Sequence, residues 1–150
     1  MVVALRPIDE SNVKAVFSLT VGPGQENFVA PNPWSLAQAL AEYEIALPRA
    51  IAADDTIVGF LMLQIDHSDE DGRPFWLWRF MIGAEHQRHG YGVAALRLAV
   101  DELRQRGATE VFTSWVPGEG SPEGFYLKFG FQPTGEIDGD EIVGRLALAP

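Results

Sequence analysis

The chain of 150 residues contains no cysteine, which excludes disulfide bonds, a thiol nucleophile and a thiolate metal site. It also lacks a long hydrophobic run. Apolar stretches such as IVGFLML at 57–63 fall far short of the roughly 20 residues that a membrane span requires. The first ten residues lack the basic start and apolar stretch of a signal peptide, so we expect a cytoplasmic protein that does not bind membranes.

Positive charge is scarce, with 11 Lys and Arg against 21 Asp and Glu and a formal net charge of −10. Because an acidic surface cannot replace the counterions around phosphate, nucleic-acid binding is not expected. The charge suits a cationic small molecule, and the alternative is that it serves solubility alone. The length predicts one domain over residues 1–150.

Hydrophobic periodicity and turn residues predict the element order β-α-α-β-β-β-α-β-α-β-β, an α/β domain on a mixed sheet. Asp9 or Ser11 is expected to cap the first helix, and Ser35 the second, which should end before Pro48. The third helix is expected to bury one stripe of apolar residues, namely Ala95, Leu96, Ala99, Val100 and Leu103. The strands are expected at 3–9, in two runs of 49–66 on either side of a hairpin turn at 54–56, and at 75–82, 109–116, 131–136 and 141–148.

The segment QRHGYG at 87–92 places Gly-x-Gly at the start of a helix. Glycines there let a ligand approach the backbone, and the free N–H groups with the helix dipole favour a phosphate or pyrophosphate. The alternative is that the glycines serve packing alone. The Rossmann and P-loop patterns are absent, which disfavours a nucleotide-binding protein. His86 and His89, with His67 far away, make a poor zinc site, so no metal is expected.

Two motifs together resemble the GNAT N-acetyltransferases. QRHGYG matches the family's Gln/Arg-x-x-Gly-x-Gly/Ala pyrophosphate loop, and FYLKFGF at 125–131 matches its C-terminal Phe-Tyr-x-x-x-Gly-Phe signature. The element order is also similar over essentially the whole chain. The resemblance implies a mostly antiparallel mixed sheet with a splayed strand pair at the acyl-CoA site and about four flanking helices.

The resemblance also implies a set of residues for acetyl-CoA, which it makes the co-substrate. The backbone of Phe80, Met81 and Ile82 would bind pantetheine, Gln87 would shape the turn, and Tyr126 would lie near the sulfur as a catalytic proton donor. The pyrophosphate would lie on the backbone amides of Arg88, His89, Gly90, Tyr91, Gly92 and Val93.

This sequence departs from the family at two positions. Glu119 stands where many members have an asparagine that contacts pantetheine, and Trp78 stands where some have a glutamate base. The base therefore stays unassigned among the carboxylates Glu26, Glu42, Glu44 and Asp66, each of which is alternatively a solvated surface acid. The residues predicted to bind the acceptor are Glu26, Glu42 and Trp78. Aromatic residues Trp34, Tyr43 and Trp76 are further candidates for a cation, or else part of the packing.

Segments 25–42, 75–82 and 133–143 resemble the bacterial spermine/spermidine acetyltransferase branch. This implies acetyl transfer from acetyl-CoA to a primary amine of a polyamine or diamine, such as spermidine or spermine, by direct attack in a ternary complex. Other acceptors remain open: an amino acid, an aminoglycoside or a peptide N-terminus. So does a non-catalytic acyl-CoA-binding module. Family members are often dimers, so a homodimer is compatible with the resemblance.

Overall fold

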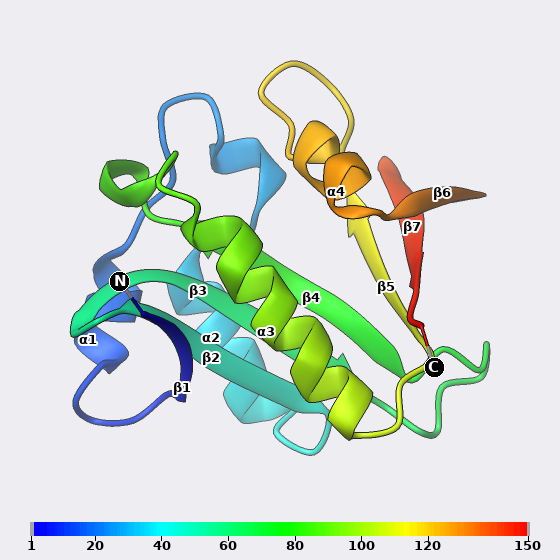
Figure 1. The fold of residues 1–150 in the computed structure, drawn as a ribbon, viewed down its shortest axis with the longest axis horizontal. Helices are drawn as coiled ribbons and strands as arrows, with labels where there is room; N and C mark the ends of the chain where they lie inside the picture. Colours follow the sequence, from blue (N-terminus) through cyan, green and yellow to red (C-terminus); the bar gives the residue numbers. More distant parts are fainter. Residues whose placement is uncertain (1, 150) are drawn as a thin grey trace.

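The computed structural model describes residues 2–149. Its elements follow the order predicted from the sequence, with two short 3-10 turns added at Glu26–Phe28 and Ala84–His86 (Figure 1). The strands are β1 Val3–Pro7, β2 Ala46–Ala53, β3 Thr56–Ile65, β4 Phe75–Ile82, β5 Glu110–Trp115, β6 Gln132–Asp138 and β7 Glu141–Ala147. The helices are α1 Val13–Ser18, α2 Asn32–Ala41, α3 Tyr91–Gln105 and α4 Glu123–Phe129.

Within residues 2–149, seven strands form one mixed sheet in the order β1-β2-β3-β4-β5-β7-β6. All neighbours are antiparallel except β4 and β5, which run parallel and pair at a single register position, Trp76 with Phe112. Beyond that pair the two strands diverge, as Figure 1 shows. The sheet therefore opens at its centre, which confirms the predicted splayed pair.

Helix α3 covers one face of the sheet, lying across β2–β4 (Figure 1). Its five predicted core residues are all buried: Ala95, Leu96, Ala99, Val100 and Leu103. Each fully buried Leu side chain removes enough apolar surface from water to contribute about 1.5–3 kcal/mol. Gly107, with φ +99°, follows the last turn of the helix and reverses the chain.

Helices α1 and α2 cover the other face, where a second cluster packs around Val16, Phe60 and Met62. The boundaries of α2 differ from the prediction. Ser35 is not a cap, because its N–H already bonds to the Pro31 carbonyl at 3.1 Å inside the first helical turn. Pro33 lies in the first helical turn, where a backbone N–H would have no partner within the helix. A proline is therefore tolerated there, and the helix begins at Asn32.

Strand β2 begins at Ala46 and runs through Pro48, which the sequence analysis expected to lie outside it. Pro48 pairs with Met62 on β3, and the last β1 partner of β2 is Pro7, opposite Arg49. Pro48 thus lies one position beyond the β1 ladder. There the strand has a free edge, so a residue without an N–H is tolerated.

None of the helices described in residues 2–149 has the length and apolar character needed to cross a bilayer.

Candidate active site

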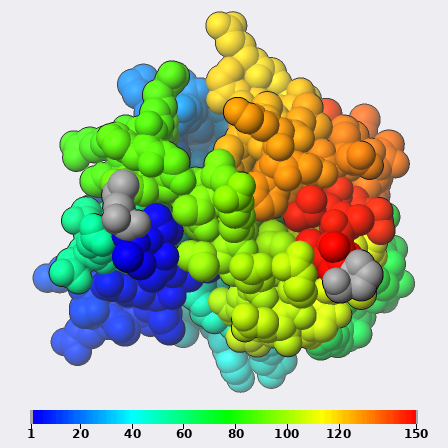
Figure 2. All heavy atoms as spheres, in the orientation of Figure 1, coloured from blue at the N-terminus to red at the C-terminus, as the bar shows by residue number. Residues whose placement is uncertain are grey.

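A cavity of about 860 Å³ opens where β4 and β5 diverge. Five segments line it: the loop at 21–31, the end of β4, the loop and helix start at 86–93, the region from β5 to α4, and the β6–β7 turn. The space-filling view shows a recess between the green segment near residues 85–90 and the orange α4 (Figure 2). Its size lies in the range of small-molecule sites.

The glycine loop forms one wall of this cavity and ends at the start of α3. Arg88 has φ +65° and Gly90, the N-cap, has φ +79°, so the chain turns through two left-handed positions before Tyr91. The N–H groups of the first helical turn have no carbonyl partner within the helix and are free for an anion. The loop can therefore hold a phosphate with backbone atoms alone.

The structure brings most of the predicted loop residues to the cavity, namely Gln87, Arg88, Gly90, Tyr91, Gly92 and Val93. The side chain of His89 instead stacks on Tyr91, with ring centroids 5.5 Å apart, and its Nδ1 lies 3.1 Å from the His86 carbonyl oxygen. His89 does not line the cavity. The imidazole of His89 is thus directed away from the cavity, and a role for its backbone amide stays a prediction.

Gln87 joins the loop to two other walls of the site. Its Nε2 donates to the Ile82 carbonyl at 3.0 Å and to Gln25 Oε1 at 2.8 Å. Gln25 Nε2 donates back to Gln87 Oε1 at 3.3 Å, and Gln25 Oε1 also accepts from the Gly22 N–H at 3.0 Å. The turn is therefore fixed to β4 and to the 21–31 loop. Sequence reasoning missed Gln25, because the two amides are 62 residues apart.

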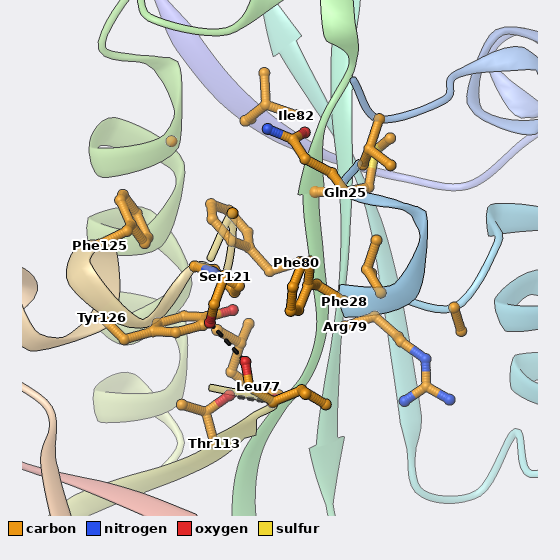
Figure 3. Close-up of a pocket in the computed structure, with 18 of the residues that line it drawn as sticks. Gln25, Phe28, Leu77, Arg79, Phe80, Ile82, Thr113, Ser121, Phe125 and Tyr126 are labelled. Atoms are coloured by element: carbon orange, nitrogen blue, oxygen red, sulfur yellow. Dashed lines mark hydrogen bonds between the residues drawn. The ribbon is translucent and has the colours of Figure 1, made fainter. Parts of the chain in front are cut away.

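The end of β4 offers one backbone edge to the cavity. Phe80, Met81 and Ile82 line the space, and β3 occupies their other edge in antiparallel pairing. The edge toward β5 has no strand partner past Trp76, so an extended ligand chain can add hydrogen bonds to it. Thr113 Oγ1 donates to the Leu77 carbonyl at 3.0 Å and closes the narrow end of the divergence (Figure 3).

Tyr126 lies on α4 with its ring directed toward β4 (Figure 3). It is 5 % exposed, stacks on Trp115 at 5.5 Å, and has Phe80 and Phe125 nearby. Burial raises the pKa of the phenol above its usual value of 10.0, although the Thr113 hydroxyl opposes this shift. At neutral pH the group is therefore a protonated hydrogen-bond donor. With a raised pKa it is better suited to stabilising a thiolate by a hydrogen bond than to giving up its proton outright.

The predicted acceptor residues divide between the cavity and the surface. Glu26 and Trp78 line the cavity. Glu42 lies at the C-terminal end of α2, is exposed and does not line it, and neither do Glu44 and Asp66. Trp34 and Tyr43 are also outside it, at 59 % and 72 % exposed. Of the predicted carboxylates, the structure thus brings Glu26 alone to the site.

Arg79, next to Trp78, was not predicted as a site residue and also lines the cavity. Its guanidinium lies 5.6 Å from the Trp78 ring and donates to Gln38 Oε1 at 3.0 Å. Burial lowers its pKa, which Glu141 and Glu42 partly counteract. Within residues 2–149 no carboxylate lies within ion-pair distance of it, and its Nε is buried without a partner. The site therefore contains a partly buried cation whose charge is not neutralised locally.

Three further residues that sequence reasoning missed line the opposite side: Ser114, Asp140 and Glu141. Ser114 Oγ donates to Glu141 Oε1 at 3.4 Å. Burial raises the pKa of the Glu141 carboxyl, and the charges of Asp140 and Asp138 add to this, while Ser114 and Arg79 oppose it. The turn DGDE entered the sequence analysis only as part of the 133–143 resemblance, although its last residue, Glu141, begins strand β7 beside β5.

Glu119, which replaces the family's asparagine, does not line the cavity, whereas Ser121 does. Ser121 Oγ donates to the Val116 carbonyl at 2.6 Å and accepts from the Glu123 N–H at 3.1 Å. These bonds hold the loop that leads into α4. In residues 2–149 no three His, Asp or Glu side chains gather so that they could hold a metal ion.

Comparison with known proteins gives the same family as the motifs. The model of the acetyltransferase (GNAT) family matches residues 5–131. No curated protein matches the chain.

Several solved structures share the fold. An acetyltransferase from Thermus thermophilus superposes with a TM-score of 0.76 at 18 % identity, over 99 % of this chain and 98 % of that one. The PaiA N-acetyltransferase from Thermoplasma acidophilum, in complex with coenzyme A, gives 0.70 at 17 % identity over 98 % and 99 %. The ribosomal-protein-S18-alanine N-acetyltransferase from Escherichia coli gives 0.71 at 18 % over 99 % and 96 %.

The family match spans most of the chain, and the element order, the splayed strands and the glycine loop agree with it. The chain belongs to the GNAT family of acetyl-CoA-dependent acetyltransferases.

Proposed function

We propose that the protein transfers an acetyl group from acetyl-CoA to a primary amine of a polyamine or diamine, such as spermidine or spermine. The amine attacks directly in a ternary complex, since the chain has no cysteine to carry the acyl group. One observation carries the proposal: the glycine loop, the open edge of β4, Tyr126 and three carboxylates all line a single cavity. The cytoplasmic location and the homodimer considered from the sequence stay predictions.

The residues present fit acetyl-CoA. Left-handed φ angles at Arg88 and Gly90 turn the loop toward free first-turn amides, which suit a pyrophosphate. The unpaired edge of β4 at Phe80–Ile82 suits the amides of pantetheine. When bound, acetyl-CoA would supply the activated acetyl thioester. Tyr126 is then placed to donate a hydrogen bond to the departing sulfur.

Charge supports a cationic acceptor. Glu26, Asp140 and Glu141 line the cavity against two guanidinium groups, those of Arg79 and Arg88. Arg88 belongs to the loop proposed for the pyrophosphate, whose negative charge would offset it. This leaves three carboxylates against one cation for the acceptor. Since one face of Trp78 already carries Arg79, any cation–π contact with the acceptor would need the other face of the ring.

Arg79 favours a second candidate, an amine that also carries a carboxylate, such as an amino acid. A partly buried guanidinium without an ion-pair partner in residues 2–149 is costly, and a carboxylate on the acceptor would offset that cost. The amine would then lie toward the carboxylates and the acid toward Arg79. The two candidates differ in whether the acceptor's second group is positive or negative.

Thiol release from acetyl-CoA, measured with a panel of amines, separates these functions. The panel contains spermidine, spermine, putrescine, several amino acids, an aminoglycoside and a peptide with a free N-terminus. The proposal expects the highest kcat/KM with spermidine or spermine. Release with an amino acid and none with a polyamine would contradict the polyamine proposal and support the second candidate. Tight CoA binding without release for any amine would show a non-catalytic acyl-CoA-binding module.

A further inference from the structure

The family motifs do not identify the base that deprotonates the amine, because Trp78 stands at the position of the glutamate found in some members. We propose that Glu141, on the first position of β7, binds the acceptor ammonium and accepts its proton, with the Ser114 hydroxyl orienting the carboxylate. This inference rests on the proposed N-acetyltransfer and holds for either kind of acceptor named above.

The strand pairing places Glu141 at the mouth of the divergence. Trp115, the last residue of β5, pairs with Ile142, and Ser114 pairs with Val143. Ile142 packs against the core beneath α3, so alternation along β7 directs Glu141 to the opposite face. Ser114 is on that same face, as its contact with the Glu141 carboxylate shows. This face is the one that α1, α2 and the 21–31 loop cover.

Charged and polar groups from every neighbouring element act on Glu141. Arg79 on β4 lowers its pKa, the charges of Asp138 and Asp140 on its own hairpin raise it, and its own charge raises the pKa of Tyr126 on α4. Arg79 and Tyr126 lie on opposite sides of the gap between β4 and β5, and the charge of Glu141 raises the pKa of both. Glu141 therefore lines the same cavity as Tyr126, from the side of β7.

Glu141 differs from the other two carboxylates of the cavity in its burial. Glu26 and Asp140 are exposed, whereas Glu141 is half-buried. Glu26 Oε2 is also already engaged, because it accepts the Gly24 N–H at 3.0 Å. Partial burial makes a carboxylate a better base, because water stabilises its charge less. It also strengthens its attraction to an ammonium ion.

The acceptor nitrogen loses two protons as it is acetylated, and Glu141 takes the first. The ammonium gives one proton to the Glu141 carboxylate, and the freed lone pair of nitrogen bonds to the acetyl carbonyl carbon. The carbon–sulfur bond then breaks, and its electron pair leaves on sulfur. The Tyr126 hydroxyl stabilises the leaving thiolate by a hydrogen bond, the second proton of nitrogen passes to water, and the thiolate takes a proton from water. The proton held by Glu141 passes to water. The products are the acetamide, CoA thiol and one proton.

The test is Glu141→Gln in the full chain, assayed with the amine that the wild-type protein uses best in the panel. A general base contributes about 10²–10⁴-fold, so kcat/KM for the amine should fall by that factor while the Kd for CoA stays unchanged. The remaining activity should rise about tenfold per pH unit toward pH 10, following the free-amine fraction, since an alkylammonium has a pKa near 10.4. Glu141→Asp should recover part of the activity.

The matched control is Glu70→Gln, which makes the same charge change at an exposed residue away from the cavity and should retain wild-type kinetics. Activity of Glu141→Gln within about twofold of the wild type would overturn the proposal. So would an equal loss in the Gln and Asp variants with the wild-type pH profile, which would show a structural role. A wild-type protein that acetylates no amine overturns this proposal together with the proposed function.

Discussion

The side-chain amides of Gln25 and Gln87 pair reciprocally across 62 residues of sequence, at 2.8 and 3.3 Å. Gln25 belongs to the 21–31 loop, which is proposed to face the acceptor, and Gln87 to the loop proposed for the pyrophosphate. The pair therefore couples the two halves of the site mechanically. A residue outside the glycine loop should on this account affect acetyl-CoA binding.

Gln25→Ala removes both hydrogen bonds to the Gln87 side chain. The KM for acetyl-CoA should rise by about 3- to 10-fold, since a hydrogen bond contributes about 0.5–1.5 kcal/mol. Gln25→Glu keeps the acceptor for the 2.8 Å bond and should have the smaller effect. Steady-state kinetics with acetyl-CoA as the varied substrate measure both. A KM for Gln25→Ala equal to that of the wild type would show that the 21–31 loop does not affect acetyl-CoA binding.

Tyr126→Phe should lower kcat by about 10²-fold or more, because the variant cannot donate a hydrogen bond to the departing sulfur. The ring and its stacking on Trp115 remain, so the Kd for CoA and the melting temperature should hardly change. Turnover, calorimetric CoA binding and thermal unfolding measure these three quantities. Unchanged turnover would remove Tyr126 from the mechanism.

Gly90→Ala should lower the free energy of unfolding by about 1–2 kcal/mol, because the residue has φ +79° and an L-residue is strained there. Its CoA affinity should fall as the loop relaxes. Gly92→Ala is the matched control for stability, since Gly92 lies in α3 and its added Cβ would contact the Phe80 and Phe125 rings at an ordinary 3.5 Å. Urea unfolding of both variants tests this. Equal losses of stability would contradict the assigned role of the left-handed turn.

Glu141 should also make stability depend on pH in a defined direction. Its pKa is raised above the reference value of 4.5 in the folded state, so folding favours the protonated form. Its contribution is fully present below that reference value and is lost as pH rises through the folded-state pKa. Glu141→Gln should therefore gain melting temperature relative to the wild type between pH 4 and neutral pH. A gap that stays constant over this range would contradict the burial of the carboxylate.

Features set by neighbouring residues could be predicted from the sequence, whereas features set by distant residues could not. Gly90 and the buried stripe from Ala95 to Leu103 follow from local periodicity and turn chemistry, so both the loop and α3 were predicted. Glu141 and Gln25 were missed because their partners, Ser114 and Gln87, are 27 and 62 residues away. Pro48 was placed outside the strand because its position depends on where β1 ends. Local rules predicted the elements, and side-chain partners required the assembled sheet.

The central claim is that acetyl donor and amine meet in one cavity between β4 and β5. A crystal structure with CoA and the preferred amine tests it most directly. The account predicts the pyrophosphate on the amides of 88–93, the sulfur next to the Tyr126 hydroxyl, and the amine nitrogen within hydrogen-bond distance of Glu141. A pyrophosphate bound away from the glycine loop, or an amine nitrogen on another carboxylate, would contradict it.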